Sequence, residues 1–300
     1  MMTMEETVST EPVLGTRWDL VVVGAGYWGS AIAEAAEERG WRTLVIDDGD
    51  EEGASRNSAG YVRWEWLEGR LGTILPAWWD DEAKRASMEL LPRWGAAGVT
   101  EMIHSYRTDQ WSEAPGLFVV NPWDVLHKSH TARVRLVNRT PAGWQVLTSL
   151  GDVIPAHRVV IATGVWTDPL LEASGLEPLG VEQLIGSAVL ARGELDHHVV
   201  AYNTRPYHNV TARRWSNGRI RVGETVSRVY PDSHLGALVN DAYRLFPKLS
   251  GFEPILGRRP ALPVATVKEL GDGLVVAVGG HRIGLALAGG IAQKVMEVLS

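Results

Sequence analysis

WDLVVVGAGYWGSAIAEAAEERG, residues 18–40, joins an apolar run, a glycine-rich turn and a stretch of small residues. The apolar run Trp18–Val23 is typical of a strand that is buried on both faces. The small residues after the turn predict a helix over Ser30–Arg39, which ends because Gly40 follows. A second strand is predicted over Thr43–Ile46. Together these segments form a βαβ unit, which is right-handed in almost every known case.

The turn between strand and helix has the spacing GxGxxG, in the place where a dinucleotide-binding site requires it. Gly24 permits a tight turn, Gly26 lets the backbone approach a pyrophosphate, and Gly29 allows the helix to pack closely on the strand. The N-terminus of the helix then faces the anion. Asp47 ends the second strand, where its carboxylate can accept hydrogen bonds from both ribose hydroxyls and disfavours the 2′-phosphate of NADP. The alternative is a tight turn without a ligand.

Three further segments favour FAD over NAD. Residues 53–60 (Gly-Ala-Ser-Arg-Asn-Ser-Ala-Gly) resemble the small-residue segment that lies along the FAD pyrophosphate and flavin. Residues 159–164 resemble the strand ending in Ala-Thr-Gly that is found in flavoproteins with two dinucleotide-binding domains. Residues 279–284 form a glycine-rich turn between a buried strand, Leu274–Val278, and a predicted helix, Leu285–Leu299. The N-terminus of that helix suits the negative charge that reduced flavin carries at its O2 side.

In their order and spacing, these segments resemble the D-amino-acid oxidase family of FAD enzymes, which includes glycine oxidase and sarcosine oxidase. Residues 257–260 (Gly-Arg-Arg-Pro) resemble the G-x-R-P segment of the family, and residues 280–284 resemble the glycine-oxidase turn with an arginine two residues before a glycine. The resemblance implies that Arg259 and Arg282 clamp the carboxylate of the substrate, because paired guanidinium groups fix its orientation. An ion pair within the fold for Arg259, and a contact with the flavin or the backbone for Arg282, are the alternatives.

The resemblance also implies which residues contact FAD. Val134 is aligned with a valine whose backbone meets adenine. Only twelve residues lie between Val120 and Arg133, where relatives have a longer helix, so the adenine end of the site is expected to be trimmed. The expected cofactor contacts are Gly24, Gly26, Tyr27, Trp28, Gly29, Asp47, Asp48, Ser55, Arg56, Asn57, Ser58, Ala59, Gly60, Val134, Ala162, Thr163, Gly164, Trp166, Gly280, Arg282, Ile283, Gly284 and Leu285.

The cofactor that the resemblance implies also suggests the reaction. An amine in its neutral form would pass a hydride from its α-carbon to flavin N5, and the imine would hydrolyse to a carbonyl compound and a smaller amine. The expected substrate is a small primary or secondary amine with a carboxylate, glycine-like at its reacting end. His281 either accepts the amine proton or is structural. The electron acceptor is O2 or another oxidant, and Lys248 is the only lysine of residues 176–256 that could assist O2 as in some oxidases of the family.

Two rival functions use the same cofactor. One is an NAD(P)H-dependent flavoprotein reductase, which is disfavoured because no second GxGxxG follows a predicted strand. The other is an FAD-binding protein without catalytic activity.

Composition narrows the chemistry further. The chain has no cysteine, which excludes disulfides, thiolate metal sites, iron–sulfur clusters and a cysteinyl flavin. No histidine lies near residues 53–60, so we expect non-covalent FAD, and we expect no metal. The net charge of −7 argues against a uniformly basic nucleic-acid binder. Residues 1–16 have no apolar signal-peptide core and no apolar run spans about 18 residues, so we expect a cytoplasmic enzyme without membrane contact. The oligomeric state is left open.

A basic stripe lies between Tyr202 and Tyr230, where there are six arginines and one acid, Glu224. Either the stripe is a solvated strand face, or it binds a polyanionic substrate such as an amino-acid-modified base in DNA or RNA. The flavin half of the bifunctional enzyme that modifies the tRNA wobble uridine is the family precedent for the second reading. The arginines are Arg205, Arg213, Arg214, Arg219, Arg221 and Arg228, and Tyr207, His208 and Trp215 lie between them.

Four tryptophans follow the expected flavin segment: Trp64, Trp66, Trp78 and Trp79. They form either an aromatic wall at the mouth of the active site or part of the core, in which tryptophan takes the place of phenylalanine.

Parallel-type buried strands lie at both ends of the chain and in its middle, at Arg158–Ala162, whereas residues 176–256 alternate as an antiparallel sheet does. The predicted fold class is therefore α/β: a Rossmann-like FAD-binding domain with a mostly parallel sheet, and an inserted antiparallel β-rich substrate domain. Residues 61–115 are expected to form a tryptophan-rich helical cap, with a helix over Asp81–Ala97. The expected division is a flexible leader at 1–16, FAD-binding segments at 17–175 and 257–300, and a substrate domain at 176–256.

Overall fold

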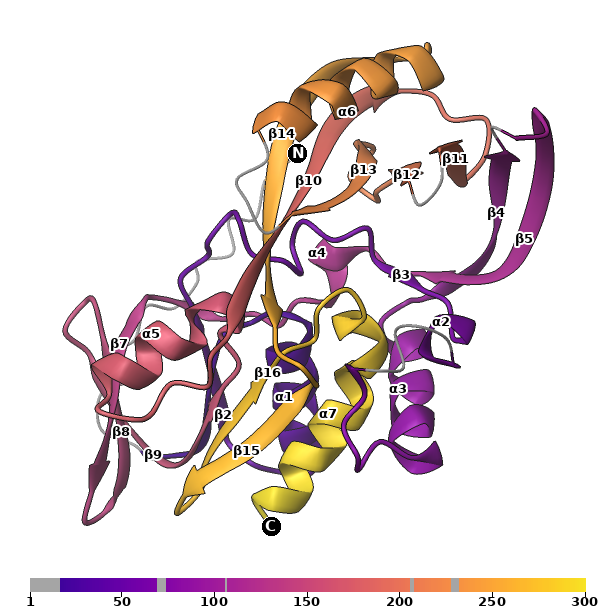
Figure 1. Ribbon diagram of the computed structural model, residues 1–300. Coiled ribbons are helices and arrows are strands. Elements are labelled where there is room, and N and C mark those ends of the chain that lie inside the picture. Colours follow the sequence, from indigo (N-terminus) through magenta and orange to yellow (C-terminus); the bar gives the residue numbers. More distant parts are fainter. Residues whose placement is uncertain (1–16, 69–73, 106, 206–207, 228–231) are drawn as a thin grey trace, which may run out of the picture.

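The computed structural model describes residues 17–68, 74–105, 107–205, 208–227 and 232–300. Two eight-stranded sheets, A and B, organise the chain (Figure 1). The expected leader at 1–16 lies outside the described residues.

Sheet A has the strand order β15-β16-β9-β1-β2-β6, and the hairpin β7–β8 continues it from β9. The pairs β1–β2, β1–β9, β16–β9 and β2–β6 are parallel, as predicted. Buried apolar residues fill the parts of the central strands that lead to the site, such as residues 20–23 of β1 and 159–161 of β9, because both faces of the sheet are covered there. The strands are β1 (Trp18–Val23), β2 (Thr43–Asp47), β6 (His130–Thr131), β7 (Val134–Thr140), β8 (Gly143–Thr148), β9 (Val153–Ile161), β15 (Thr266–Gly271) and β16 (Leu274–Val278).

Helices cover one face of sheet A. They are α1 (Tyr27–Glu38), α3 (Asp81–Arg93) and α7 (Gly284–Val298), and they share one apolar core with alternate residues of β1 and β16. Two glycines of α7 allow close packing on α3, since a Cβ at Gly289 would lie 2.4 Å from the carbonyl oxygen of Ala86. Helix α5 (Thr167–Ala173) and the β7–β8 hairpin cover the opposite face. Further short helical segments are α2 (Glu65–Glu68), α4 (Pro122–Val125) and a 3₁₀ turn at Gly164–Trp166.

Sheet B has the strand order β14-β10-β13-β12-β11-β4-β5-β3, and all its pairs are antiparallel except β11–β4. Helix α6 (Asp232–Leu245) lies across it and closes a separate apolar core (Figure 1). The strands are β3 (Tyr61–Val62), β4 (Ala97–Ser105), β5 (Gln110–Val119), β10 (Glu182–Gly193), β11 (Val199–Arg205), β12 (His208–Arg214), β13 (Ile220–Ser227) and β14 (Leu249–Ala261).

Three predicted elements need correction. Helix α1 begins at Tyr27 rather than Ser30, so the end of the GxGxxG motif already forms its first turn. Helix α3 ends at Arg93 rather than Ala97, because Gly95 follows its C-cap with a φ of 69°, a conformation that glycine adopts without strain. Residues 97–119, most of which were expected in a helical cap, form the hairpin β4–β5 instead.

The β4–β5 hairpin carries few buried residues and finds its partner, β11, about a hundred residues away along the chain, as in the pairing of Val199 with Glu101. Its strands therefore lack the regular apolar alternation that marks a half-buried strand in sequence. The partition of the chain at 175/176 and 256/257 stays a prediction.

Candidate active site

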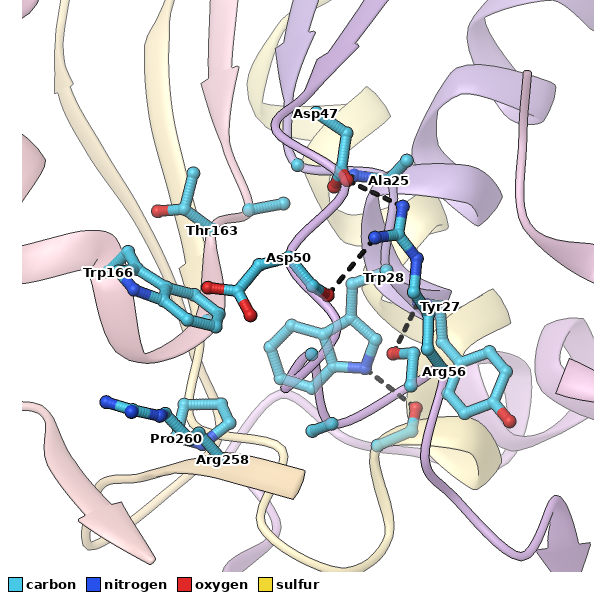
Figure 2. A pocket seen from close by; sticks show the side chains of 18 of the residues that line it. Ala25, Tyr27, Trp28, Asp47, Asp50, Arg56, Thr163, Trp166, Arg258 and Pro260 are labelled. Carbon is cyan, nitrogen blue, oxygen red and sulfur yellow. Dashed lines mark hydrogen bonds and ion pairs between the residues drawn. The ribbon is translucent and has the colours of Figure 1, made fainter. Parts of the chain in front are cut away.

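A cavity of about 1060 Å³ lies where the carboxyl ends of β1, β2, β9 and β16 meet strands β13 and β14 of sheet B (Figure 2). Ligands of open α/β sheets bind outside the carboxyl ends of parallel strands, so this is the expected place for a site. Of the site residues predicted from sequence, all line the cavity except Gly29, Asn57 and Ile283.

The three exceptions lie behind the cavity wall and contact other parts of the fold. A Cβ at Gly29 would lie 1.8 Å from the carbonyl oxygen of Gly24, so its role is to let α1 pack on the turn. The Asn57 amide donates to the carbonyl of Leu256 on β14 at 2.8 Å. Ile283 is buried in the core beneath α7. These contacts within the fold account for the three residues, and their contact with a cofactor stays a prediction.

The first glycine-rich turn is held against residues 53–60. Gly24 has a φ of 102°, and a Cβ there would lie 2.5 Å from the carbonyl oxygen of Ala162 at the end of β9. The Ser55 hydroxyl accepts a hydrogen bond from the backbone N–H of Tyr27 at 3.0 Å. A Cβ at Gly26 would lie 3.1 Å from the same hydroxyl oxygen. Backbone groups and one hydroxyl thus surround the N-terminus of α1, which is the arrangement that a pyrophosphate needs.

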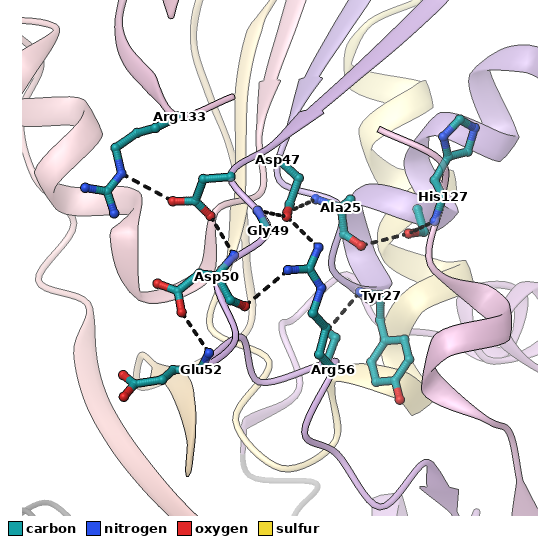
Figure 3. A network of polar contacts seen from close by, with 12 residues as sticks. Ala25, Tyr27, Asp47, Gly49, Asp50, Glu52, Arg56, His127 and Arg133 are labelled. Atoms are coloured by element: carbon teal, nitrogen blue, oxygen red, sulfur yellow. Dashed lines mark hydrogen bonds and ion pairs between the residues drawn. The ribbon is translucent and has the colours of Figure 1, made fainter. Parts of the chain in front are cut away.

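Asp47 organises the loop after β2 (Figure 3). Its Oδ2 accepts from the N–H of Ala25 at 2.7 Å, and its Oδ1 accepts from the N–H of Gly49 at 2.8 Å and from the Arg56 guanidinium at 2.7 Å. The sequence predicted Asp47 as a ribose acceptor but not its ion pair with Arg56. The ion pair brings residues 53–60 onto the end of β2.

The cavity wall beside β2, where the adenine end of FAD is expected, contains short elements, and the trimming of that end stays a prediction. The strand next to β2 is the two-residue β6, and the only helix between β5 and β6 is α4. Arg133 forms an ion pair with Asp48 at 3.3 Å (Figure 3), and Val134 and Arg135 line the wall beyond it.

The second glycine-rich turn is joined to the first by Trp28. The indole N–H of Trp28 donates to the carbonyl of Gly284 at 2.7 Å, across 256 residues of sequence. A Cβ at Gly280 would lie 2.8 Å from the indole ring, so only glycine fits there. Figure 2 shows Trp28 beneath the centre of the cavity.

His281 lies in this turn with a φ of 46°, which is uncommon for a residue other than glycine. Its Nε2 is 3.2 Å from the carbonyl oxygen of Leu262, so this nitrogen carries a hydrogen and donates it. In the neutral ring Nδ1 is then an acceptor.

Two buried arginines of the basic stripe reach the flavin segment predicted at 53–60. Arg213 donates to the carbonyl oxygens of Ala59 and Gly60, the latter at 3.2 Å, and Nε of Arg221 donates to the carbonyl of Asn57 at 2.9 Å. Both side chains are 3% exposed, and Arg221 lines the cavity. Burial lowers the pKa of the Arg213 guanidinium from its ordinary value. These residues hold the segment against sheet B.

Tyr27 lies beside the same arginines and is buried. Its hydroxyl forms a hydrogen bond of 2.5 Å with the hydroxyl of Ser58. Burial raises the pKa of the Tyr27 phenol to about 12, although Ser58 and the charges of Arg213 and Arg221 act in the opposite direction. The phenol therefore stays protonated at neutral pH.

The two neighbouring arginines of the G-x-R-P segment have different surroundings. Arg258 forms an ion pair with Glu52 and its backbone N–H donates to the Glu52 carbonyl at 2.8 Å, which ties β14 to the loop after β2. Arg259 lines the cavity from β14, and Arg282 lines it from the second turn, where it is exposed to solvent. Arg258 thus forms an ion pair within the fold, and the roles of Arg259 and Arg282 stay predictions.

Two other arginines of the stripe lie at the surface. Arg214 donates to the carbonyl of Gly193 at 3.0 Å, and Arg219 forms an ion pair with Glu253. Trp215 is buried, so it offers no face on which a base could stack. The side chains at 205, 207, 208, 224 and 228 lie outside the described residues. The described part of the stripe therefore favours a structural role.

The tryptophans after the flavin segment also belong to the core. Trp64, Trp78 and Trp79 pack against the cluster between α1, α3 and α7, and none of the three lines the cavity. The tryptophans that do line it are Trp28 and Trp166. The side chain of Trp66 lies outside the described residues.

Lys248 is remote from the cavity. It forms an ion pair with Asp196 at 2.6 Å on the surface, and this contact raises its pKa.

Sequence reasoning missed Arg135, Asp50 and Arg221 as lining residues. Asp50 and Arg135 belong to no motif, and Arg221 was recognised only as part of the basic stripe.

Comparison with known proteins agrees with this geometry. The sequence matches the family described as FAD dependent oxidoreductase (DAO) over residues 19–113 and 125–298. The chain therefore belongs to this family, and its cofactor is FAD. No curated protein sequence matches the chain significantly.

Several solved structures share the fold over nearly the whole chain. Glycine oxidase from Geobacillus kaustophilus is 19% identical, with 94% of each chain covered and a TM-score of 0.69. Iminodiacetate oxidase from Chelativorans sp. BNC1 is 16% identical, with 93% of this chain and 95% of that chain covered and a TM-score of 0.69. L-proline dehydrogenase from P. horikoshii is 13% identical, with 96% and 94% covered and a TM-score of 0.72.

The residues of the cavity fit FAD. The turn at Gly24 leaves no room for a side chain, so backbone at the N-terminus of α1 lines the cavity, and the carboxylate of Asp47 lies beside it. Among the described residues, no group of three or more histidine or acidic side chains could hold a metal ion. No described helix is long and apolar enough to cross a membrane.

Proposed function

We propose that this protein oxidises the C–N bond of a small amine that carries a carboxylate, either glycine-like or secondary at its reacting end. The observation that supports it most is the position of Arg259, which lines the cavity from sheet B opposite the glycine-rich turns. Membership of an FAD-dependent oxidoreductase family and the fold shared with glycine oxidase, iminodiacetate oxidase and L-proline dehydrogenase point the same way.

In this proposal, Arg259 binds the substrate carboxylate and Arg282 assists from the rim of the cavity. A guanidinium group can hold a carboxylate through two parallel hydrogen bonds, so the α-carbon is oriented as well as bound. FAD, when bound, supplies the acceptor for the hydride that leaves this carbon. The protein therefore contributes mainly positioning. Nδ1 of His281 is available to accept a proton from the substrate ammonium group before oxidation.

Besides the amine, the reaction consumes only water and an electron acceptor. Two electrons and one hydrogen leave the α-carbon, the nitrogen lone pair forms a C=N bond, and water adds to give a carbonyl compound and the smaller amine. O2 or another oxidant would reoxidise the cofactor. The sequence predicts a cytoplasmic location for this reaction.

The test is anaerobic reduction of the bound flavin, followed by its visible absorbance. Glycine, sarcosine and iminodiacetate are compared with NADH and with an amine that has no carboxylate. Arg259→Leu should keep FAD but lose about 10- to 100-fold in kcat/KM for the carboxylated amines, the range expected for a hydrogen-bonded charge pair. Arg214→Leu, on the surface of the same sheet, is the matched control.

Arg282→Ala should have a smaller effect than Arg259→Leu, because solvent screens an exposed charge. Reduction by NADH alone would instead indicate a reductase. If no carboxylated amine reduces the flavin, or if Arg259→Leu is as active as the unmodified protein, the proposal is wrong. The described side chains of the stripe on β12 and β13 carry no observation that favours a nucleic-acid substrate, so no second function is proposed.

A further inference from the structure

Gly186 on β10 lies beside Arg259 on β14, and its lack of a side chain has no evident role in the fold. Strands β10 and β14 pair so that Gly186 is opposite Gly257 and Leu184 is opposite Arg259. Directly opposite residues, and residues two apart on one strand, share a face of the sheet. Gly186, Gly257 and Arg259 therefore lie on one face. This face is turned toward the predicted flavin segment, residues 53–60, since a Cβ at Gly257 would lie 3.4 Å from the Cβ of Asn57.

The guanidinium of Arg259 occupies the place where a side chain at 186 would begin. A Cβ at Gly186 would lie 2.8 Å from one terminal nitrogen of Arg259, 2.9 Å from Cζ and 3.2 Å from Nε. Contact with three atoms of the same planar group means that the guanidinium lies across the glycine. Gly186 is not among the residues with positive φ, so its backbone does not require glycine. The space above it is what requires glycine.

We propose that Gly186 is a positioning residue that sets the place of the Arg259 guanidinium and thereby the affinity of the site for a carboxylate. The inference rests on the proposed function, in which Arg259 binds the substrate carboxylate. An alanine at 186 would displace the guanidinium by roughly 0.7 Å to restore an ordinary contact of about 3.5 Å. The displaced group is the end of a flexible side chain, so the sheet itself need not move.

The decisive experiment compares Gly186→Ala with Gly98→Ala as FAD-loaded proteins. Gly98 is exposed on β4 of the same sheet, and a Cβ there would lie 4.0 Å from its nearest neighbour, Phe118. The first readout is the Kd of acetate, a carboxylate without an amine, from the perturbation of the flavin spectrum. Gly186→Ala should weaken acetate binding and raise KM about tenfold, because displacements near 1 Å can cost up to about 100-fold. FAD content and Tm should match those of Gly98→Ala.

A second pair of variants separates positioning from general damage. In the Arg259→Leu background, Gly186→Ala should add nothing further to the acetate Kd or to KM. An equal loss in both backgrounds, or an acetate Kd unchanged by Gly186→Ala alone, would overturn the role of Gly186. If Arg259→Leu itself leaves the acetate Kd unchanged, the carboxylate clamp and the role of Gly186 both fail. If Arg259→Leu weakens acetate binding and Gly186→Ala does not, only the role of Gly186 fails.

Discussion

Sheets A and B build opposite walls of one cavity by different means. The wall from sheet A consists of turns at the ends of strands, where glycines such as Gly24 and Gly280 leave backbone groups close to the cavity. The wall from sheet B carries side chains, among them Arg221 and Arg259, that project from the strands. A wall made of backbone is encoded in a few adjacent residues, whereas a wall made of side chains depends on which strands become neighbours.

The largest effect is expected from a substitution that disrupts the cavity wall formed by sheet A. Gly29→Ala places a Cβ 1.8 Å from a backbone oxygen, which no side-chain motion can relieve. We expect the variant to lose FAD and to be destabilised by about 3 kcal/mol or more. The flavin-to-protein ratio after purification and Tm measure this loss.

Gly236→Ala in α6 is the control for that substitution. Nothing lies within 4 Å of a Cβ at this position, so it should retain FAD and be neutral or slightly stabilising. Full FAD content in Gly29→Ala would show that the first turn is not set by close backbone packing.

An intermediate effect tests how the two walls are joined. Arg213→Leu removes the buried guanidinium that donates to the carbonyl groups of Ala59 and Gly60. The Gly60 carbonyl keeps the backbone N–H of Val120 as a donor, whereas the half-buried Ala59 carbonyl loses the donor that Arg213 supplies. The free energy of unfolding should fall by about 1–3 kcal/mol, and FAD should dissociate faster. Arg214→Leu, the next residue along β12, should change stability by no more than about 0.5 kcal/mol. Similar losses in both variants would contradict the distinction between the buried and the surface arginines.

The smallest expected effect is confined to alkaline pH. The pKa of Tyr27 is raised to about 12 in the folded state, above the ordinary value of 10.0. Between these values the folded state binds more protons than the unfolded state, so stability falls as pH rises, by at most about 1.4 kcal/mol per pH unit. The contribution is fully present below pH 10 and is lost through pH 12.

Tyr27→Phe should remove this alkaline dependence while it also loses the hydrogen bond to Ser58. Urea unfolding at a series of pH values measures the slope in both proteins. An unchanged slope between pH 10 and 12 would assign the dependence to another group.

Sequence patterns predicted sheet A more completely than sheet B. The strands β1 and β16 have the predicted ends, because a continuous apolar run bounded by a glycine-rich turn has few other interpretations. The hairpin β4–β5 was missed because its residues are mostly exposed or half-buried and its partner is distant in sequence. For the same reason the stripe of arginines could not be divided into buried and surface members before the strands were placed.

Within the site, the sequence by itself determined the two glycine-rich turns, Asp47, the small-residue segment 53–60 and the pair of adjacent arginines at 258 and 259. These features are local, and their chemistry follows from residue type and spacing. Only the tertiary structure decided that Arg258 pairs with Glu52 while Arg259 lies across Gly186. Strand pairing and the absence of one side chain place that guanidinium, and neither can be read from the residues on either side of it.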